Sequence, residues 1–138
     1  MSFPEGQSFS KNITAIGYTD CDKKPAFKLA LHKDGDRWYL YCGLFWQSGF
    51  SIIEVTDPTN PRFVRYVEGP SNTWTLQVQV ADGLLVTSQE KIMEGWGHVE
   101  GQTWGEGVLI WDLKDPENPE LLSHWKTGGD GTHRNYYD

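Results

Sequence analysis

The residues most able to do chemistry are clustered at the end of the chain, where residues 133–138 read HRNYYD. A histidine titrates near neutral pH and can act as a general base or a metal ligand, and an arginine binds anions through paired N–H groups. His133 is therefore the candidate catalytic base or ligand of a divalent metal, and Arg134 a candidate anion-binding residue. Hydrogen bonding between strands is the structural alternative for both. One histidine does not make a metal site, so further ligands would have to come from elsewhere.

A second candidate is the segment 89–106, QEKIMEGWGHVEGQTWGE, which places Trp96, His98 and Trp104 among glycines. Aromatic side chains in a long loop are typical of a lid or a wall over a binding site. The alternative is a loop that packs its own tryptophans against a neighbouring sheet. Glu94 and Glu100 add carboxylates around His98, but their spacing matches no recognised metal site.

Two stretches share a motif that determines how these residues are positioned. Residues 49–66 read GFSIIEVTDPTNPRFVRY and residues 107–125 read GVLIWDLKDPENPELLSHW, so the two D-P-x-N-P segments, 57–61 and 115–119, occur in the same register. In each segment the Asp side chain can accept the N–H two residues on, proline fixes φ, and Asn tolerates the left-handed region. Each stretch therefore predicts a hairpin with a stiff turn, and the shared register predicts an internal repeat.

Each repeat is expected to form four antiparallel strands. Without the segment 89–106, the offset between the two D-P-x-N-P segments is close to the roughly 40–45 residues of a propeller blade. An Asp82-Gly83 pair is a strong hairpin-turn signal inside the second repeat. The predicted strands are 26–31, 37–42, 50–55 and 62–67 in blade one (26–67), and 75–80, 84–88, 108–113 and 121–125 in blade two (75–125). The tryptophans in or beside these strands are expected to pack in the core: Trp38, Trp74, Trp111 and Trp125.

The two ends of the chain suggest an incomplete ring. Residues 13–18 resemble a fourth strand without the first three, a latch that would complete a distant blade, and residues 132–138 resemble the first strand of a third blade. The predicted fold class is all-β, a single partial β-propeller domain over 1–138, with two complete four-stranded blades plus one strand of each flanking blade. Because two blades cannot close a ring, the expected partners are the remaining blades, on a complementary chain or in a longer protein.

The hairpins IIEVTDPTNPRFVRY and LIWDLKDPENPELLSHW resemble the repeat of the LVIVD-repeat β-propellers, a bacterial and mostly uncharacterised family whose blades carry D-P-x-N-P between two apolar strands. The resemblance covers both complete blades and implies the propeller fold. The family lends no catalytic residues that map onto this chain.

In a propeller, the loops between blades and the loops between second and third strands emerge at one end of the ring, opposite the D-P-x-N-P turns. The segment 89–106, the loop at Trp46 and the loop before Trp74 are therefore expected on one face. First strands line the axis, where Lys28, Gln77 and His133 occupy one equivalent level, and polar residues beside the axis indicate a wet channel or a binding site.

Bulk properties exclude several classes of partner. The 138 residues carry a net charge of −7, which disfavours binding to nucleic acid or to an anionic membrane. No apolar run approaches the roughly 18 residues of a membrane span, and the first residues lack an apolar signal core, which predicts a cytoplasmic location. In that setting Cys21 and Cys42 are expected to be free thiols.

The predicted function is a ligand- or partner-binding propeller module that uses the face with segment 89–106 and the channel mouth to bind a small molecule or a partner. The alternative is an enzyme, with or without a divalent metal, whose active site at the channel mouth is shared with absent blades. A propeller fold does not decide between them, because function depends on the site.

Overall fold

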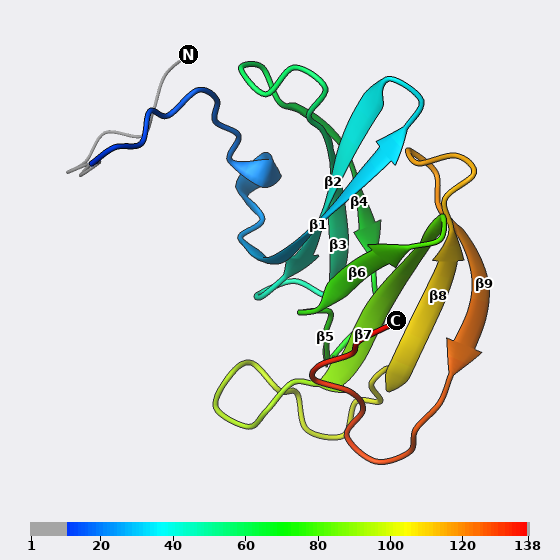
Figure 1. Ribbon diagram of the computed structural model, residues 1–138. Helices are drawn as coiled ribbons and strands as arrows, with labels where there is room; N and C mark the ends of the chain where they lie inside the picture. The colour runs from blue at the N-terminus through cyan, green and yellow to red at the C-terminus, as the bar shows by residue number, and fades with distance from the viewer. Residues whose placement is uncertain (1–10, 138) are drawn as a thin grey trace.

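The computed structural model describes residues 11–137 of the chain, which form two antiparallel β-sheets and no α-helix (Figure 1). The first sheet is a meander in the order β1 (Ala26–Asp34), β2 (Arg37–Leu44), β3 (Gly49–Glu54) and β4 (Arg62–Glu68). In the second sheet β7 (Leu84–Lys91), β8 (Gly107–Asp112) and β9 (Glu120–Trp125) follow one another, and both β5 (Thr73–Trp74) and β6 (Val78–Ala81) pair with β7. A short 3-10 segment, η1 (Cys21–Lys23), precedes β1. The predicted all-β class is confirmed, and the sheets form no closed ring within the described residues.

The turns form for the reasons that the sequence indicates. In the first D-P-x-N-P turn, Asp57 Oδ1 accepts the Thr59 N–H at 2.9 Å, and in the second, Asp115 Oδ1 accepts the Glu117 N–H at 3.0 Å. Side-chain hydrogen bonds from Thr59 to Asp57 and from Asn118 to Asp115, together with these backbone bonds, hold the pKa of both aspartates below the usual range. The Asp82-Gly83 turn has φ of 52° and 73°, the pair of positive values that a type I′ hairpin requires.

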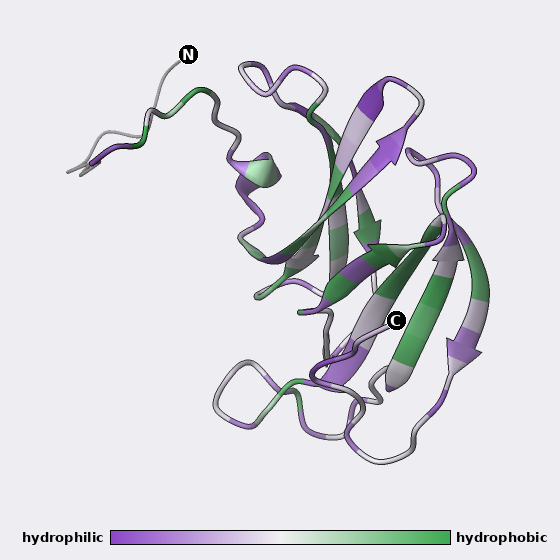
Figure 2. Cartoon of the chain, in the orientation of Figure 1, coloured by the Kyte–Doolittle hydropathy of each residue, from purple (hydrophilic) through white to green (hydrophobic). Residues whose placement is uncertain are grey.

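The core lies between the two sheets, which pack face to face. The phenyl ring of Phe50 in β3 meets the indole of Trp111 in β8 edge to face, with centroids 5.4 Å apart. Hydrophobic residues run along the middle of the strands, whereas the tip of the β1–β2 hairpin is hydrophilic (Figure 2). The first sheet contributes Tyr39, Tyr41, Phe50 and Ile52 to this core, the second contributes Val78 and Leu85, and Leu113 joins them directly after β8.

The strand registers show that the two sheets pack through opposite faces of the repeat. Ile52 pairs with Tyr41, and Ile110, which occupies the position of Ile52 in the second repeat, pairs with Val86, so Tyr41 and Val86 are equivalent. Tyr41 contributes to the intersheet core, but its equivalent does not: the second sheet instead uses Leu85, whose side chain alternates to the other face. The face of the first sheet that carries Tyr41 therefore meets the face of the second sheet that carries Leu85, which is the opposite face of the repeat. The two sheets are arranged head to tail.

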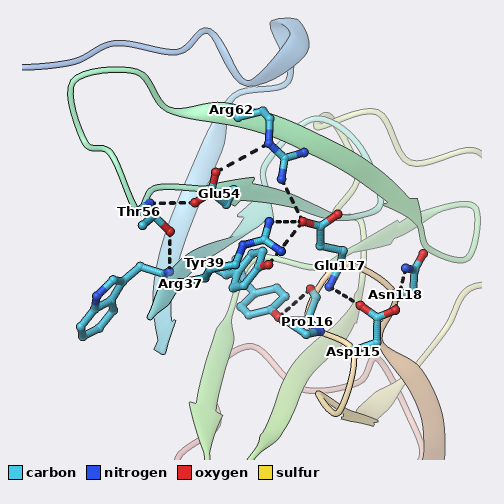
Figure 3. A network of polar contacts seen from close by, with 11 residues as sticks. Arg37, Tyr39, Glu54, Thr56, Arg62, Asp115, Pro116, Glu117 and Asn118 are labelled. Atoms are coloured by element: carbon cyan, nitrogen blue, oxygen red, sulfur yellow. Dashed lines mark hydrogen bonds and ion pairs between the residues drawn. The ribbon is translucent and has the colours of Figure 1, made fainter. Parts of the chain in front are cut away.

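The second D-P-x-N-P turn also docks onto the first sheet (Figure 3). Glu117 Oε1 accepts hydrogen bonds from Arg37 at 2.5 Å and Arg62 at 2.8 Å, and the bond from Arg62 is the main cause of the lowered pKa of Glu117. The buried Tyr41 hydroxyl donates to the carbonyl oxygen of Pro116 at 2.9 Å. The turn therefore joins the repeats as well as reversing the chain.

Three predicted strands differ from the structure. Residues 13–18 are not a strand. Gly17 lies against the carbonyl oxygen of Pro58 in the first D-P-x-N-P turn. The predicted strand 75–80 is interrupted, because Thr75 bridges to Leu44 of the other sheet. Residues 132–137 are not a strand either, although Gly131 bridges to Glu90 in β7; Asp138 lies outside the described residues.

Candidate functional site

Most of the predicted site residues lie at one end of the molecule. The loop between β7 and β8, the loop between β2 and β3 and the segment after β9 all emerge at this end, and the two D-P-x-N-P turns lie at the other (Figure 1). The predicted segment 89–106 begins inside β7, so its loop covers residues 92–106.

Three of the predicted tryptophans meet in one aromatic cluster. The indoles of Trp46 and Trp96 stack with centroids 5.9 Å apart and planes at 17°. Trp74 lies edge to face with Trp96, 6.2 Å between centroids. Phe45 is the centre of the group: its ring lies 4.6 Å from Trp46, 5.6 Å from Trp96, 5.8 Å from Trp74 and 5.5 Å from Phe27. The aromatic cluster therefore draws on both repeats.

The cluster has a buried base and an exposed surface. Trp74 is only 3% exposed, whereas Trp46 and Trp96 are 58% and 46% exposed. Large exposed aromatic side chains that rest on a buried aromatic support are costly to leave in water and are typical of a contact surface for a ligand. The arrangement can hold a molecule that presents a flat apolar face.

Asn72 fixes the loop that carries Trp96. Its side-chain amide donates to the carbonyl oxygens of Val99 at 3.2 Å and Gln102 at 3.3 Å, and its Oδ1 accepts the Val99 N–H at 2.9 Å. Its backbone carbonyl accepts the Ile92 N–H at 3.2 Å. Asn72 has φ of 56°, in the left-handed region that asparagine tolerates better than most residues. The Asn72 side chain therefore holds the loop at Val99 and Gln102, and its backbone carbonyl holds the start of the loop at Ile92.

Beside the cluster, His133 forms a pair that the sequence did not predict. Its Nδ1 lies 2.7 Å from Glu90 Oε2, and the side chains are 48% and 19% exposed. A carboxylate on one imidazole nitrogen fixes the ring and leaves the other nitrogen to act as a base. Trp104 is nearby rather than in the cluster: the ammonium of Lys91 lies 4.5 Å from its ring centroid, and its indole N–H donates to Gly129 at 3.2 Å.

The remaining candidates are not drawn into one site. By the strand registers Lys28 and Gln77 occupy equivalent positions. Leu29 pairs with Cys42 and Val78 with Thr87, and Cys42 and Thr87 each directly follow the equivalent pair Tyr41 and Val86. However, no hydrogen bond or ion pair within residues 11–137 joins Lys28 or Gln77 to His133, and Arg134 is exposed without such a contact in that range. The predicted shared polar level is therefore not a joined site in this part of the chain.

His98 and its neighbouring carboxylates form no metal site. Its Nδ1 is buried without a hydrogen-bond partner among the described residues. In the part of the chain that the structure describes, no group of three His, Cys, Asp or Glu side chains is arranged to hold a metal ion. The candidate set of Glu94, His98 and Glu100 is therefore not brought together.

Sequence reasoning missed Phe45, Phe27, Glu90 and Asn72. Phe45 is next to Trp46 in a loop expected at this end, so the adjacent aromatic pair was an available signal. Glu90 was counted within the predicted loop, but β7 continues through it and brings it beside the segment after β9. Nothing in the sequence indicates that Asn72 would reach the loop between β7 and β8.

The two thiols lie together outside the aromatic cluster. Both cysteines are free, Cys42 being buried in the first sheet and Cys21 packing against it from η1. Cys21 has φ of 53° and the next two residues 55° and 59°, an unusual left-handed run. A hydrogen bond from the Cys42 thiol lowers the pKa of Cys21 to about 7, whereas that bond and burial raise the pKa of Cys42.

We expect the folded protein to be alkylated selectively at Cys21. The thiolate is the reactive form, so the rate with iodoacetamide should rise through pH 7 and level off by about pH 8, with Cys42 unmodified. Peptide mapping by mass spectrometry measures each site. Cys42→Ala removes the donated hydrogen bond, so it should raise the pKa of Cys21 and slow the reaction at pH 7 several-fold. Equal labelling of both cysteines, or a rate at Cys21 that still climbs above pH 9, would contradict this assignment.

The chain matches no protein-family model, and it matches no curated protein. Within residues 11–137, no helix combines the length and hydropathy needed to cross a bilayer.

Proposed function

We propose that the chain is a binding module that uses the aromatic cluster of Phe27, Phe45, Trp46, Trp74 and Trp96. The observation that carries the proposal is the stacked pair of half-exposed indoles, Trp46 and Trp96, which come from different repeats and rest on the buried Trp74. A loop that only packed its own tryptophans would bury them, and these two remain open to solvent. The cluster suits a ligand or partner group with a flat apolar face, such as a sugar ring, an aromatic ring or a proline.

We also propose that the two sheets are neighbouring blades of an incomplete propeller of the LVIVD-repeat type. Three observations support this: the repeated hairpin sequence, the head-to-tail packing of equivalent sheets, and a bridge that follows each repeat. After each repeat the chain pairs once more with the second strand of that repeat, Thr75 with Leu44 of β2 and Gly131 with Glu90 of β7. The partners under this proposal are further blades. The apolar strip of Leu29 and Leu31 on β1, about half exposed, is a surface that a preceding blade would cover.

The binding proposal is tested by loss of affinity. A panel of sugars, aromatic acids and proline-rich peptides is titrated into ¹⁵N-labelled protein, and the indole N–H signals report where each compound binds. For any compound that shifts the signals of Trp46 and Trp96, Trp46→Ala and Trp96→Ala should each weaken binding about tenfold or more, because each removes one face of the stack.

Trp38→Ala is the matched control, because Trp38 is also partly exposed, at 37%, but is outside the cluster. It should leave the affinity unchanged. A compound that binds the wild type and both cluster variants equally well would remove the aromatic cluster as the site.

The second candidate function is an enzyme at the same end, and the Glu90–His133 pair favours it. In this alternative the imidazole, oriented by the carboxylate, is the general base, and a divalent metal would need ligands from further blades. Metal analysis of the intact assembly separates the two functions. Stoichiometric bound metal, lost in His133→Ala, would favour the enzyme.

A further inference from the structure

A cavity of about 270 Å³ opens between the two sheets, and its lining includes no residue of the aromatic cluster. Its walls are mainly apolar: Phe50 and Val67 line it from the first sheet, and Leu109 and Leu121 from the second. Cavities of this size and character hold small organic molecules, and an apolar pocket with a few convergent polar groups is typical of a binding site.

One wall of the cavity carries three buried polar side chains. Thr75 and Thr87 are fully buried and Gln89 is 1% exposed. Gln89 replaces an apolar residue of the repeat: Phe50 pairs with Gly43, and Val108 with Ser88, so the residue equivalent to Gln89 is Leu44. A buried glutamine costs free energy unless its amide is fully hydrogen-bonded.

The amide of Gln89 is only half satisfied. Its Nε2 donates to the carbonyl oxygen of Ser88 at 2.7 Å and to Thr75 Oγ1 at 3.3 Å, which fixes the amide orientation. Its Oε1 is buried and has no partner among the described residues. This leaves one strong, unpaired acceptor on a residue that lines the cavity.

The two threonines supply donors beside it. Thr75 Oγ1 accepts the Gly49 N–H at 3.0 Å, and Thr87 Oγ1 accepts the Trp111 indole N–H at 3.1 Å. Within residues 11–137, both hydroxyl oxygens accept hydrogen bonds and neither hydroxyl hydrogen is donated to an acceptor. Because Gln89 and Thr75 are hydrogen-bonded to each other, the free acceptor and a free donor lie side by side.

We propose that this cavity binds a small, mainly apolar molecule with one hydroxyl group, of the phenol or short-chain alcohol class. The ligand hydroxyl donates to Gln89 Oε1 and accepts from the Thr75 hydroxyl, while its ring or chain lies against Phe50 and Leu121. The site is independent of the aromatic cluster, so either can fail without the other.

Phenol and toluene provide the test, because they differ chiefly in the hydroxyl. Each is titrated into the ¹⁵N-labelled full chain, with the Trp111 indole N–H and the Gln89 amide as reporters. Phenol should shift both signals saturably and bind about tenfold more tightly than toluene, the effect of one net hydrogen bond. Gln89→Leu, which installs the residue found at the equivalent position, should abolish the preference for phenol.

A pair of variants on β9 keeps the proposal testable if Gln89→Leu fails to fold. Leu121 and Leu122 are both about half exposed, but only Leu121 lines the cavity. Leu121→Trp should block phenol binding and Leu122→Trp should leave it intact. The proposal is overturned if phenol gives no saturable shift in the wild type, if toluene binds as tightly as phenol, or if Leu121→Trp binds phenol with unchanged affinity.

Discussion

Replacing Phe50 by alanine should lower the free energy of unfolding by about 3–5 kcal/mol. Phe50 is 1% exposed. Its ring packs against Tyr41 of the same sheet, with 6.3 Å between ring centroids, and against Trp111 of the second sheet, with 5.4 Å between centroids. Removing the ring deletes most of its buried apolar area and enlarges the cavity between the sheets, which cannot collapse fully because both walls are strands. Urea unfolding followed by circular dichroism measures the loss.

Leu122→Ala is the control for this effect. Leu122 is an apolar side chain on the outermost strand β9, but it is 54% exposed, so its truncation should change the stability by about 0.5 kcal/mol or less. If Phe50→Ala cost no more than Leu122→Ala, the two sheets would not share a core, and the head-to-tail arrangement would be wrong. A large loss for Phe50→Ala together with a reduced m-value would instead indicate that the sheets unfold separately.

The parts of the fold that could be predicted from the sequence are those that local chemistry determines. The Asx turns at Asp57 and Asp115 and the type I′ turn at Asp82-Gly83 form from residues adjacent in the chain, so the strands beside them follow closely. The strand over 75–80 could not be placed correctly, because its break depends on a bridge from Thr75 to Leu44 in the other sheet. Alternation along TLQVQV carries no information about that distant partner.

The sequence predicts the burial of one strand tryptophan, Trp74, correctly and is wrong for another, Trp125. Trp74 is buried as expected for a strand residue, but Trp125 is 63% exposed although it ends an apolar run. The reason is that β9 is the last strand of its sheet, with every residue exposed, and strand order at the edge cannot be obtained from a hydrophobic pattern. Packing of Trp125 in the core was therefore a wrong prediction.

The sequence predicts at which end of the molecule the candidate site lies, but not which side chains contact one another there. Equivalent loops of a repeat emerge at the same end, so Trp46, Trp74 and Trp96 could be assigned to one face, and the structure brings all three together. The partner of His133 was not predictable, because Glu90 is distant in the sequence and reaches it only through the extension of β7.

Gly107→Ala should be the most damaging single-methyl addition in the second repeat, with a loss of about 3 kcal/mol or more in the free energy of unfolding. Gly107 has φ of 87°, and a Cβ there would lie 2.1 Å from the backbone oxygen of Trp125. That oxygen belongs to the paired strand β9, so it can move only by breaking the hairpin. Gly49 has the same geometry in the first repeat, with φ of 96° and a Cβ position 2.1 Å from the backbone oxygen of Val67, so Gly49→Ala should cost a similar amount.

Gly83→Ala separates the two causes of this loss. Gly83 has a similar φ of 73°, but no atom lies within 4 Å of its Cβ position. It should therefore show only the cost of the left-handed backbone, about 1–2 kcal/mol, partly offset by the reduced entropy of the unfolded chain. The difference between Gly107→Ala and Gly83→Ala, measured in the same urea titration, is the cost of the steric contact. Gly49 and Gly107 are the first residues of the equivalent strands β3 and β8. Equal large losses at both, with a small loss at Gly83, would show that the two repeats share one backbone requirement. In each repeat, the start of this strand must lie in contact with the end of the strand that follows it.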